Sequence, residues 1–211
     1  MPSDYDLQRQ QLVERIRAST QIQDERILNA FARVPRHEFL SRAQSSIAYE
    51  DRAVPLDEGQ TVSQPSMIAI MLSELSCQPG QRALEVGAGS GYAAAILGQL
   101  VEEVYAIELR PALAARGRAN LARSGASNVH LSEGDGSFGV AAHAPYDAIL
   151  VSAAPSQVPN ALLDQLAVGG RIAIPVGDEH AQTLLLGEKN NAGELVWQRS
   201  VPCIFVPLVS S

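Results

Sequence analysis

The sequence predicts a doubly wound α/β fold, in which helices cover a mostly parallel sheet and the last strands add an antiparallel edge. Three observations predict it. Short apolar segments end in glycine or acidic residues, helix-like segments separate them, and the final segments alternate with no helix between them. In folds of this class the ligand binds at the carboxyl ends of the strands.

The first 64 residues predict helices followed by a loop. Asp4 can cap a first helix, in which apolar residues recur at helical spacing. A second helix is predicted over residues 23–34, and Pro35 ends it because proline cannot continue a helix. A short helix through residues 39–40 follows. Residues 49–64 lose this periodicity and are predicted to form an extended or looped segment.

Residues 65–211 predict the sheet and its crossover helices. Pro65 opens a helix, since the first helical turn tolerates proline. The predicted parallel strands are 83–86, 104–108, 128–131, 146–152 and 171–176, and the antiparallel pair is 183–187 and 195–206. The predicted helices between them are 92–100, 111–123 and 159–166. We expect one domain over residues 1–211, with 1–64 as N-terminal helices and a substrate-side loop and 65–211 as the core that binds a cofactor.

Composition and charge favour a globular protein of the cytoplasm. The apolar share is 46%, and the formal net charge of -7 disfavours a nucleic-acid partner, because such binding depends on cationic contacts to phosphate. No stretch approaches the roughly 18 apolar residues that a membrane span needs. We expect a monomer with no membrane partner. An arginine cluster is expected to form the solvated face of a helix; its members are Arg110, Arg116, Arg118 and Arg123.

The cysteines and histidines predict neither a disulfide nor a metal site. Cys77 and Cys203 lack metal-like spacing and are expected to be small buried thiols. The histidines are scattered through the chain, and none forms a His-x-x-x-His signature; they are His37, His130, His143 and His180.

A glycine-rich turn follows the first predicted strand, with the sequence Glu-Val-Gly-Ala-Gly-Ser-Gly at residues 85–91. Glycines let the backbone turn sharply and approach a ligand closely. The spacing Gly-x-Gly-x-Gly differs from the dinucleotide fingerprint, because Tyr92 stands where that motif has its third glycine. Glu108 closes the second predicted strand, where a carboxylate can hydrogen-bond the ribose of either NAD or S-adenosylmethionine.

A second turn, Gly134-Asp135-Gly136, favours S-adenosylmethionine, because Asp135 can meet an adenine amino group. Each acidic residue also has a simpler interpretation. Glu85 can brace its loop, Glu108 can be a surface carboxylate, and Asp135 can form a turn. The occurrence of all three at the carboxyl ends of successive strands favours a cofactor site.

Several segments from about residue 21 to residue 209 resemble one known family. They include Gly-Gln-Thr-Val-Ser-Gln-Pro at 59–65 and Phe-Val-Pro-Leu at 205–208, together with residues 22–24, 34–39, 84–92, 134–136, 144–149, 153–155 and 174–177. The chain resembles the protein-L-isoaspartate O-methyltransferases. The resemblance implies a Rossmann-like class I methyltransferase fold, S-adenosyl-L-methionine as the methyl donor, and isoaspartyl proteins as partners.

The resemblance also assigns the site. It implies that Ser63 is the active-site residue and that residues 61–64 line the cofactor and substrate pocket. Cofactor-binding residues are then expected to be Thr61, Val62, Gln64, Glu85, Gly87, Gly89, Gly91, Glu108, Asp135 and Gly136. Substrate-binding residues are expected to be Ala153, Ala154, Pro155, Pro207 and Leu208. The chain departs from the family pattern at Ala88, Ser66 and Val209.

Methyl transfer to a carboxylate needs no general base, since carboxyl groups titrate near roughly pH 4 and are ionised at pH 7. Ser63 is therefore expected to hydrogen-bond the substrate carboxylate rather than act as a nucleophile. From the pattern alone, Ser63 could instead cap the helix that Pro65 opens.

Three other functions remain open at this point: a methyltransferase of the same fold with another carboxylate or small-molecule acceptor, a non-catalytic S-adenosylmethionine-binding module, and an NAD-dependent oxidoreductase.

Overall fold

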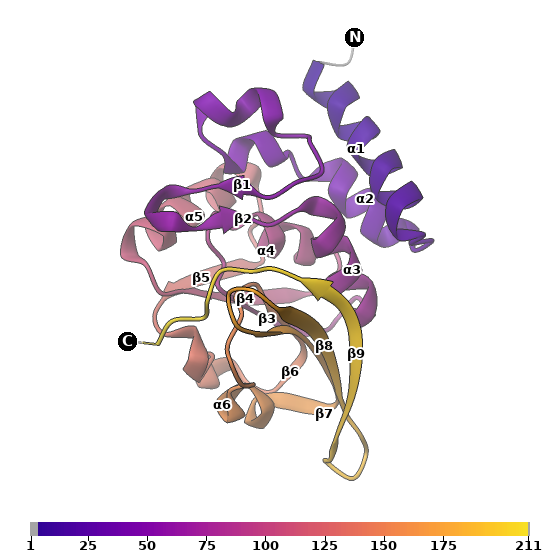
Figure 1. Ribbon diagram of the computed structural model, residues 1–211, viewed down its shortest axis with the longest axis vertical. Helices are drawn as coiled ribbons and strands as arrows, with labels where there is room; N and C mark the ends of the chain where they lie inside the picture. The colour runs from indigo at the N-terminus through magenta and orange to yellow at the C-terminus, as the bar shows by residue number, and fades with distance from the viewer. Residues whose placement is uncertain (1–3, 211) are drawn as a thin grey trace.

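A seven-stranded sheet forms the centre of the computed structural model, which describes residues 4–210 (Figure 1). Its strands are β3 (Arg82–Val86), β4 (Glu103–Glu108), β5 (Val129–Glu133), β6 (Tyr146–Val151), β7 (Leu166–Gly177), β8 (Gln182–Lys189) and β9 (Leu195–Cys203). They lie in the order β5-β4-β3-β6-β7-β8-β9. Strands β3 to β7 pair in parallel, whereas β8 and β9 complete an antiparallel meander at one edge. The predicted doubly wound fold with an antiparallel edge is confirmed.

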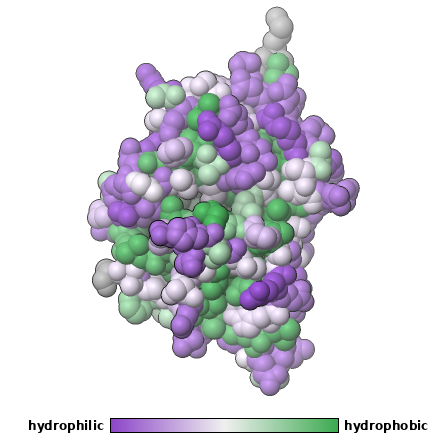
Figure 2. All heavy atoms as spheres, viewed as in Figure 1, coloured by the Kyte–Doolittle hydropathy of each residue, from purple (hydrophilic) through white to green (hydrophobic). Residues whose placement is uncertain are grey.

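Helices cover the two faces of this sheet unequally. One face carries α1 (Asp4–Thr20), α2 (Glu25–Arg33), α3 (Pro65–Leu75), α4 (Tyr92–Leu97) and α5 (Pro111–Ser124), which lie above the sheet in Figure 1. The other face carries α6 (Asn160–Asp164) and a smaller hydrophobic cluster. In Figure 2 the outer surface of the upper, helical part is mainly hydrophilic, because these helices turn their apolar residues toward the sheet.

Side-chain alternation along the strands explains how one sheet fills two cores. In β3, Ala83 faces the large cluster of α1 to α5, whereas Leu84 and Val86 face the smaller cluster around α6. All three side chains are buried, as expected for a central parallel strand that is covered on both faces.

Local signals explain where the helices begin and end. The Asp24 carboxylate accepts a hydrogen bond of 2.8 Å from the Arg26 N–H and so caps α2. Helices α3 and α5 both begin with proline, which fits a first helical turn. Gly125 ends α5 at φ 75°, a left-handed conformation that glycine adopts without strain.

The predicted extended or looped segment over residues 49–64 contains regular structure. Two-residue strands β1 (Val54–Pro55) and β2 (Thr61–Val62) pair in an antiparallel hairpin, joined through a short 3₁₀ helix at Asp57–Gly59. Further 3₁₀ helices cover Arg36–Phe39, Arg42–Ile47, Gly136–Phe138 and Ala141–His143. The hairpin places the residues that follow Thr61 beside the carboxyl end of the sheet.

Several predicted boundaries are also wrong. Helix α4 ends at Leu97 rather than residue 100. Helix α6 ends at Asp164, and β7 begins at Leu166 rather than residue 171. The start of β7 contains an irregularity, where Gly170 approaches β6 so closely that a Cβ atom would lie 3.0 Å from the Tyr146 carbonyl oxygen.

Within residues 4–210, no helix is long and apolar enough to span a membrane, and no cluster of three metal-ligating side chains is present. Cys77 and Cys203 are both buried and free.

Candidate active site

The glycine-rich turn between β3 and α4 is built from left-handed backbone. Gly87, Gly89 and Gly91 have φ values of 81°, 52° and 84°, which side chains with a Cβ rarely adopt. The Ile107 carbonyl at the end of β4 accepts hydrogen bonds from the N–H groups of Gly87 and Ala88, at 2.9 and 3.1 Å. The turn is therefore anchored to the neighbouring strand and leaves its outer side open to a cleft.

Glu108 completes that anchor. One carboxylate oxygen accepts a 2.8 Å hydrogen bond from the Gly89 N–H, and the other accepts a 2.9 Å bond from the Arg110 N–H. Glu108 is only 7% exposed, so the interpretation as a surface carboxylate is wrong. A carboxylate offers about four lone pairs, and two remain for a ligand in the cleft that Glu108 lines.

Glu85, in β3 just before the turn, is the second acidic residue of the site and is almost completely buried. One of its oxygens accepts a 2.9 Å hydrogen bond from the Ser152 hydroxyl at the end of β6. The other, Oε2, has no hydrogen-bond partner in the described part of the chain. Burial, together with the charge of Glu108, raises the pKa of Glu85 to about 8, although the hydrogen bond from Ser152 opposes this shift. An unpaired buried oxygen in a cleft marks a position where a ligand donor fits.

The turn after β5, at residues 134–136, brings its backbone close to the cleft. Gly136 lines the cleft, and a Cβ atom at this position would lie only 2.5 Å from a methyl group of Val86. Asp135 accepts hydrogen bonds from the N–H and the hydroxyl of Ser137, at 2.9 and 2.7 Å. Its turn-forming interpretation is therefore correct, and its contact with adenine stays a prediction.

Two clefts meet at this edge of the sheet. We call the first the glycine-loop cleft, which is lined by Thr61, Val62, Ser63, Glu85, Gly87, Ala88, Gly89, Glu108, Gly136, Ser152, Ala153, Pro207, Leu208 and neighbouring residues. We call the second, of about 740 Å³, the outer cleft, which is lined by Ala53, Thr61, Ser63, Gln64, Met67, His180, Ala181, Gln182, Thr183, Pro202, Cys203, Ile204 and Phe205. Among residues 4–210, only Thr61 and Ser63 line both clefts.

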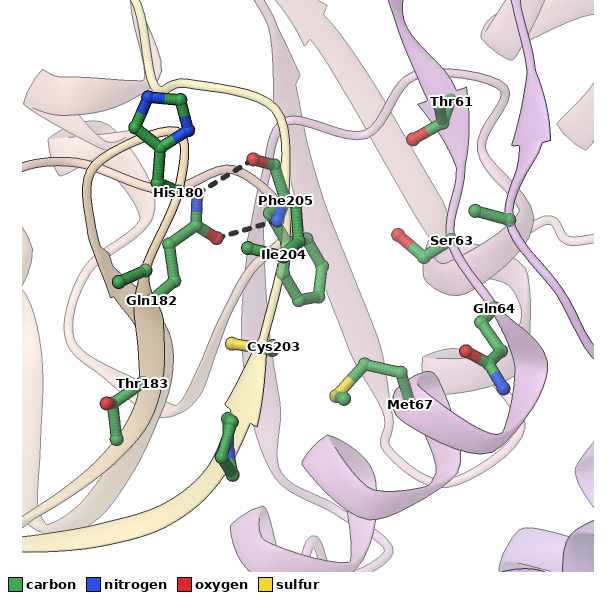
Figure 3. A pocket seen from close by; sticks show the side chains of 13 residues that line it. Thr61, Ser63, Gln64, Met67, His180, Gln182, Thr183, Cys203, Ile204 and Phe205 are labelled. Carbon is green, nitrogen blue, oxygen red and sulfur yellow. Dashed lines mark hydrogen bonds between the residues drawn. The ribbon is translucent and has the colours of Figure 1, made fainter.

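Figure 3 shows how the outer cleft is built from two walls. The β2 hairpin and the start of α3 form one wall, from which the hydroxyl groups of Thr61 and Ser63 point into the space. Strands β8 and β9 form the other wall. There the Gln182 amide binds the Phe205 backbone twice, at 2.9 Å to the carbonyl oxygen and 2.6 Å from the N–H. These bonds fix the chain after β9 in place opposite Ser63.

Ser63 does not cap the helix that follows it. Gln64 occupies the cap position of α3, and the Asp51 carboxylate accepts a 2.8 Å hydrogen bond from the Ser66 N–H. The Gln64 amide also reaches Asp51, at 3.3 Å, so that Gln64 lies on the side of the outer cleft. The capping interpretation of Ser63 is wrong, and Asp51 holds the start of α3 in its place.

The loop after β6 and the end of the chain pair with each other. The Ala154 N–H donates to the Val206 carbonyl, and the Leu208 N–H donates to the Ala154 carbonyl, both at 2.8 Å. Ala153, Pro207 and Leu208 line the glycine-loop cleft rather than the outer one. Outside both clefts, the Pro155 carbonyl accepts a hydrogen bond of 3.2 Å from the Gly177 N–H. The substrate role of this group stays a prediction.

Other predicted positions are structural or peripheral. Gly91 faces α5, where a Cβ atom would lie 3.0 Å from Leu121. Of the departures from the family pattern, Ala88 and Val209 line the glycine-loop cleft, and Ser66 is buried at the start of α3.

Sequence reasoning missed Ser152, which lines the glycine-loop cleft and binds Glu85. Its position as the last residue of the predicted strand 146–152, at the carboxyl end where parallel strands deliver ligand contacts, was the available signal.

Comparison with known proteins agrees with this geometry. The family model for protein-L-isoaspartate(D-aspartate) O-methyltransferase matches residues 7–211. A relative from Roseiflexus sp. (strain RS-1), named protein-L-isoaspartate O-methyltransferase, is 48% identical over 89% of this chain and 86% of its own. A relative of the same name from Methanopyrus kandleri is 45% identical over 95% of this chain and 91% of its own.

A solved structure from Plasmodium falciparum, described as a protein-L-isoaspartate O-methyltransferase in complex with S-adenosyl-L-homocysteine, superposes with a TM-score of 0.85. It is 26% identical and covers 96% of this chain and 98% of its own. The fold and the glycine-loop cleft define an S-adenosylmethionine-dependent methyltransferase of the Rossmann-like class. Within that class, this chain belongs to the protein-L-isoaspartate(D-aspartate) O-methyltransferase family.

Proposed function

We propose that this enzyme transfers a methyl group from S-adenosyl-L-methionine to the free carboxylate of L-isoaspartyl residues in damaged proteins, and that this transfer initiates their repair. One observation carries the proposal. The hydroxyl of Ser63 lies where the glycine-loop cleft meets the outer cleft, so that it can contact a group passing between donor and acceptor.

The residues of the glycine-loop cleft fit the methyl donor. The unpaired oxygen of buried Glu85 suits the donor's ammonium group, and the free lone pairs of Glu108 suit ribose hydroxyls. Backbone at Gly87 and Gly136 can approach an adenosyl group closely, because neither residue carries a Cβ. When bound, the donor supplies an electrophilic sulfonium methyl group.

The acceptor needs orientation rather than activation. An isoaspartyl carboxylate is ionised at pH 7 and already nucleophilic. We assign to Ser63 a hydrogen bond, donated by its hydroxyl, that fixes the attacking carboxylate oxygen in line with the methyl group. Orientation of this kind can contribute about 7–11 kcal/mol in favourable cases. The wall formed by β8 and β9, with Phe205 held by Gln182, would hold the peptide on either side of that carboxylate.

The remaining predicted residues are assigned by position. Thr61, Val62 and Gln64 shape the hairpin wall between donor and acceptor. The paired segments 153–155 and 207–208 close the glycine-loop cleft, from which Ala153, Pro207 and Leu208 would reach a bound acceptor next to the donor.

We also propose that the enzyme acts as a monomer in the cytoplasm. The described residues of a single chain form both clefts, and two buried free thiols suit a reducing compartment. Light scattering after gel filtration, with and without donor, tests the monomer.

Methyl transfer from labelled S-adenosylmethionine tests the activity. The two acceptors are an isoaspartyl peptide and a peptide of the same sequence with a normal aspartyl residue. Methyl esters are identified because base hydrolyses them and releases the label. We expect base-labile label on the isoaspartyl peptide alone. Equal label on both peptides would contradict the assigned specificity. Donor binding with no label on either peptide would instead indicate a non-catalytic binding module or a methyltransferase with another acceptor.

A further inference from the structure

Arg36 is the most unusual charged residue outside the two clefts. Its side chain is completely buried, and it forms no ion pair with the described residues. Its guanidinium group instead donates hydrogen bonds to four backbone carbonyls: Ala48 at 3.0 Å, Glu50 at 2.9 Å, Arg52 at 2.9 Å and Ser63 at 3.2 Å. Burial of a cation is costly unless such polar groups surround it.

The same guanidinium group also contacts the donor side of the site. It lies over the ring of Tyr92, 5.6 Å from the ring centroid, in a cation–π contact. Tyr92 is the first residue of α4, directly after the glycine-rich turn, and it lines the glycine-loop cleft. Arg36 therefore joins the backbone of Ser63 to the helix that follows the glycine-rich turn.

A lysine could not reproduce this arrangement. Guanidinium is planar and presents five N–H donors in a fixed fork, whereas an ammonium group presents three donors from one nitrogen and cannot reach both pairs of carbonyls. The two terminal nitrogens of Arg36 divide the contacts, since Nη1 binds Ala48 and Glu50 and Nη2 binds Arg52 and Ser63. We call residues 48–52 the clamped segment. Asp51, within it, holds the Ser66 N–H just beyond Ser63.

We propose that Arg36 is a positioning residue for methyl transfer, which sets the place of Ser63 relative to the glycine-rich turn. The inference rests on the proposed role of Ser63. Arg36 lines neither cleft, so it acts on the reaction only through the backbone that it holds and the Tyr92 ring that it contacts. Its removal should therefore slow transfer while leaving donor affinity nearly unchanged.

The test compares Arg36→Lys with the control Phe31→Leu. Phe31 is also completely buried and packs its ring 6.5 Å from that of Tyr92, on a helix outside the clamped segment. For each variant we would measure thermal stability, the Kd of the donor by calorimetry, and kcat and KM for an isoaspartyl peptide. The kcat is calculated from the concentration of enzyme that binds donor, so that unfolded molecules do not lower it.

For Arg36→Lys we expect kcat to fall at least about tenfold while the Kd of the donor changes less than about threefold. Phe31→Leu should lose comparable stability and keep kcat within about twofold. The double variant Arg36→Lys, Ser63→Ala should have the same kcat as Ser63→Ala alone, because both changes remove the same contribution of the Ser63 hydroxyl. An equal kcat loss in Phe31→Leu, or multiplicative losses in the double variant, would overturn the proposal.

A second variant covers the case in which Arg36→Lys binds no donor. Asp51→Ala removes the acceptor of the Ser66 N–H, through which the clamped segment holds the chain just beyond Ser63, and we expect a kcat at least about threefold lower with unchanged donor affinity. An unchanged kcat would overturn the positioning role. Failure of the proposed function can be distinguished from failure of the positioning role, since in the first case the unsubstituted enzyme would label no isoaspartyl peptide.

Discussion

The Glu108 carboxylate at the end of β4 accepts a 2.8 Å hydrogen bond from the Gly89 N–H in the turn that follows β3. The residue expected to bind the donor ribose therefore also fixes the shape of the glycine-rich turn. Both roles need the ionised carboxylate, because its two oxygens face the backbone donors of Gly89 and Arg110. Donor affinity should consequently depend strongly on the charge of this one group.

The first prediction concerns Glu108→Gln. The new amide presents an NH₂ group to a backbone N–H that previously faced an oxygen, so one hydrogen bond to a charged acceptor is lost. Such a bond contributes about 1.5–3 kcal/mol, and the Kd for S-adenosylmethionine should rise roughly 10–100-fold in calorimetry. Glu103→Gln, at the other end of β4 and outside both clefts, is the control and should leave the Kd within about twofold. Equal affinities for the two variants would contradict the prediction.

The second prediction concerns Ser63→Ala. Loss of a hydrogen bond to the acceptor carboxylate should lower kcat/KM for an isoaspartyl peptide about 10–100-fold, and donor affinity should stay within about twofold. Steady-state methyl transfer measures the first quantity and calorimetry the second. Ser73→Ala removes a hydroxyl from α3 outside both clefts and should behave like the unsubstituted enzyme. Full turnover in Ser63→Ala would remove Ser63 from the mechanism.

The third prediction follows from the raised pKa of Glu85. Its ordinary value is 4.5 and its folded value is about 8, so the donor-free folded chain keeps a proton that the unfolded chain loses. The contribution of protonated Glu85 to the free energy of unfolding is complete below the pKa of the unfolded state. It is lost as the pH rises through the pKa of the folded state. We expect the free energy of unfolding of the donor-free enzyme to fall between pH 5 and pH 8, with a slope of up to about 1.4 kcal/mol per pH unit. Urea titrations of Glu85→Gln should show a shallower dependence.

The fourth prediction is the binding counterpart of the third. A donor ammonium group beside Glu85 favours the ionised carboxylate, so binding near pH 7 should release up to about one proton. Calorimetry in two buffers of different ionisation enthalpy measures this number. Glu85→Gln should release none. A proton count that does not differ between the enzyme and this variant would show that Glu85 keeps its protonation state on binding.

The fifth prediction tests the close approach at Gly136. Gly136→Ala places a methyl group against Val86, and overpacking of this kind costs about 1–3 kcal/mol. Adding Val86→Ala should recover part of the loss, because the two side chains then share the space. A double-mutant cycle by chemical denaturation should give a coupling of about 1 kcal/mol or more. Strict additivity of the two single effects would indicate that Gly136 has another role.

The sequence predicted the sheet and the glycine-loop cleft because their signals are local. Apolar alternation marks each strand, and parallel strands bring their carboxyl ends to one edge, which places Glu85 and Glu108 together without any structural information. The hairpin of β1 and β2 was missed because strands of two residues have no measurable periodicity. The start of β7 was missed because Gly169 and Gly170 resemble a loop although they continue the strand.

The contacts that hold the chain around Ser63 could not be predicted from the sequence pattern. Arg36 binds the Ser63 carbonyl across 27 positions, and Asp51 binds the Ser66 N–H across 15. In the sequence both are ordinary charged residues, and their function depends on where the 3₁₀ helices and the hairpin return the chain. Spacing alone also could not separate the turn-forming and ligand-binding roles of Asp135. The division into residues 1–64 and 65–211 stays a prediction, although residues from both parts contribute to the larger hydrophobic cluster.

The pairing of Ala154 with Val206 and Leu208 has a consequence for biosynthesis. A ribosome builds the chain from its amino terminus, so Ser63 and the glycine-rich turn emerge long before the segment that closes their cleft. The wall that carries Phe205 is completed at the same late stage. The growing polypeptide therefore cannot present the finished site, and methyl transfer cannot begin, before residue 208 has left the exit tunnel.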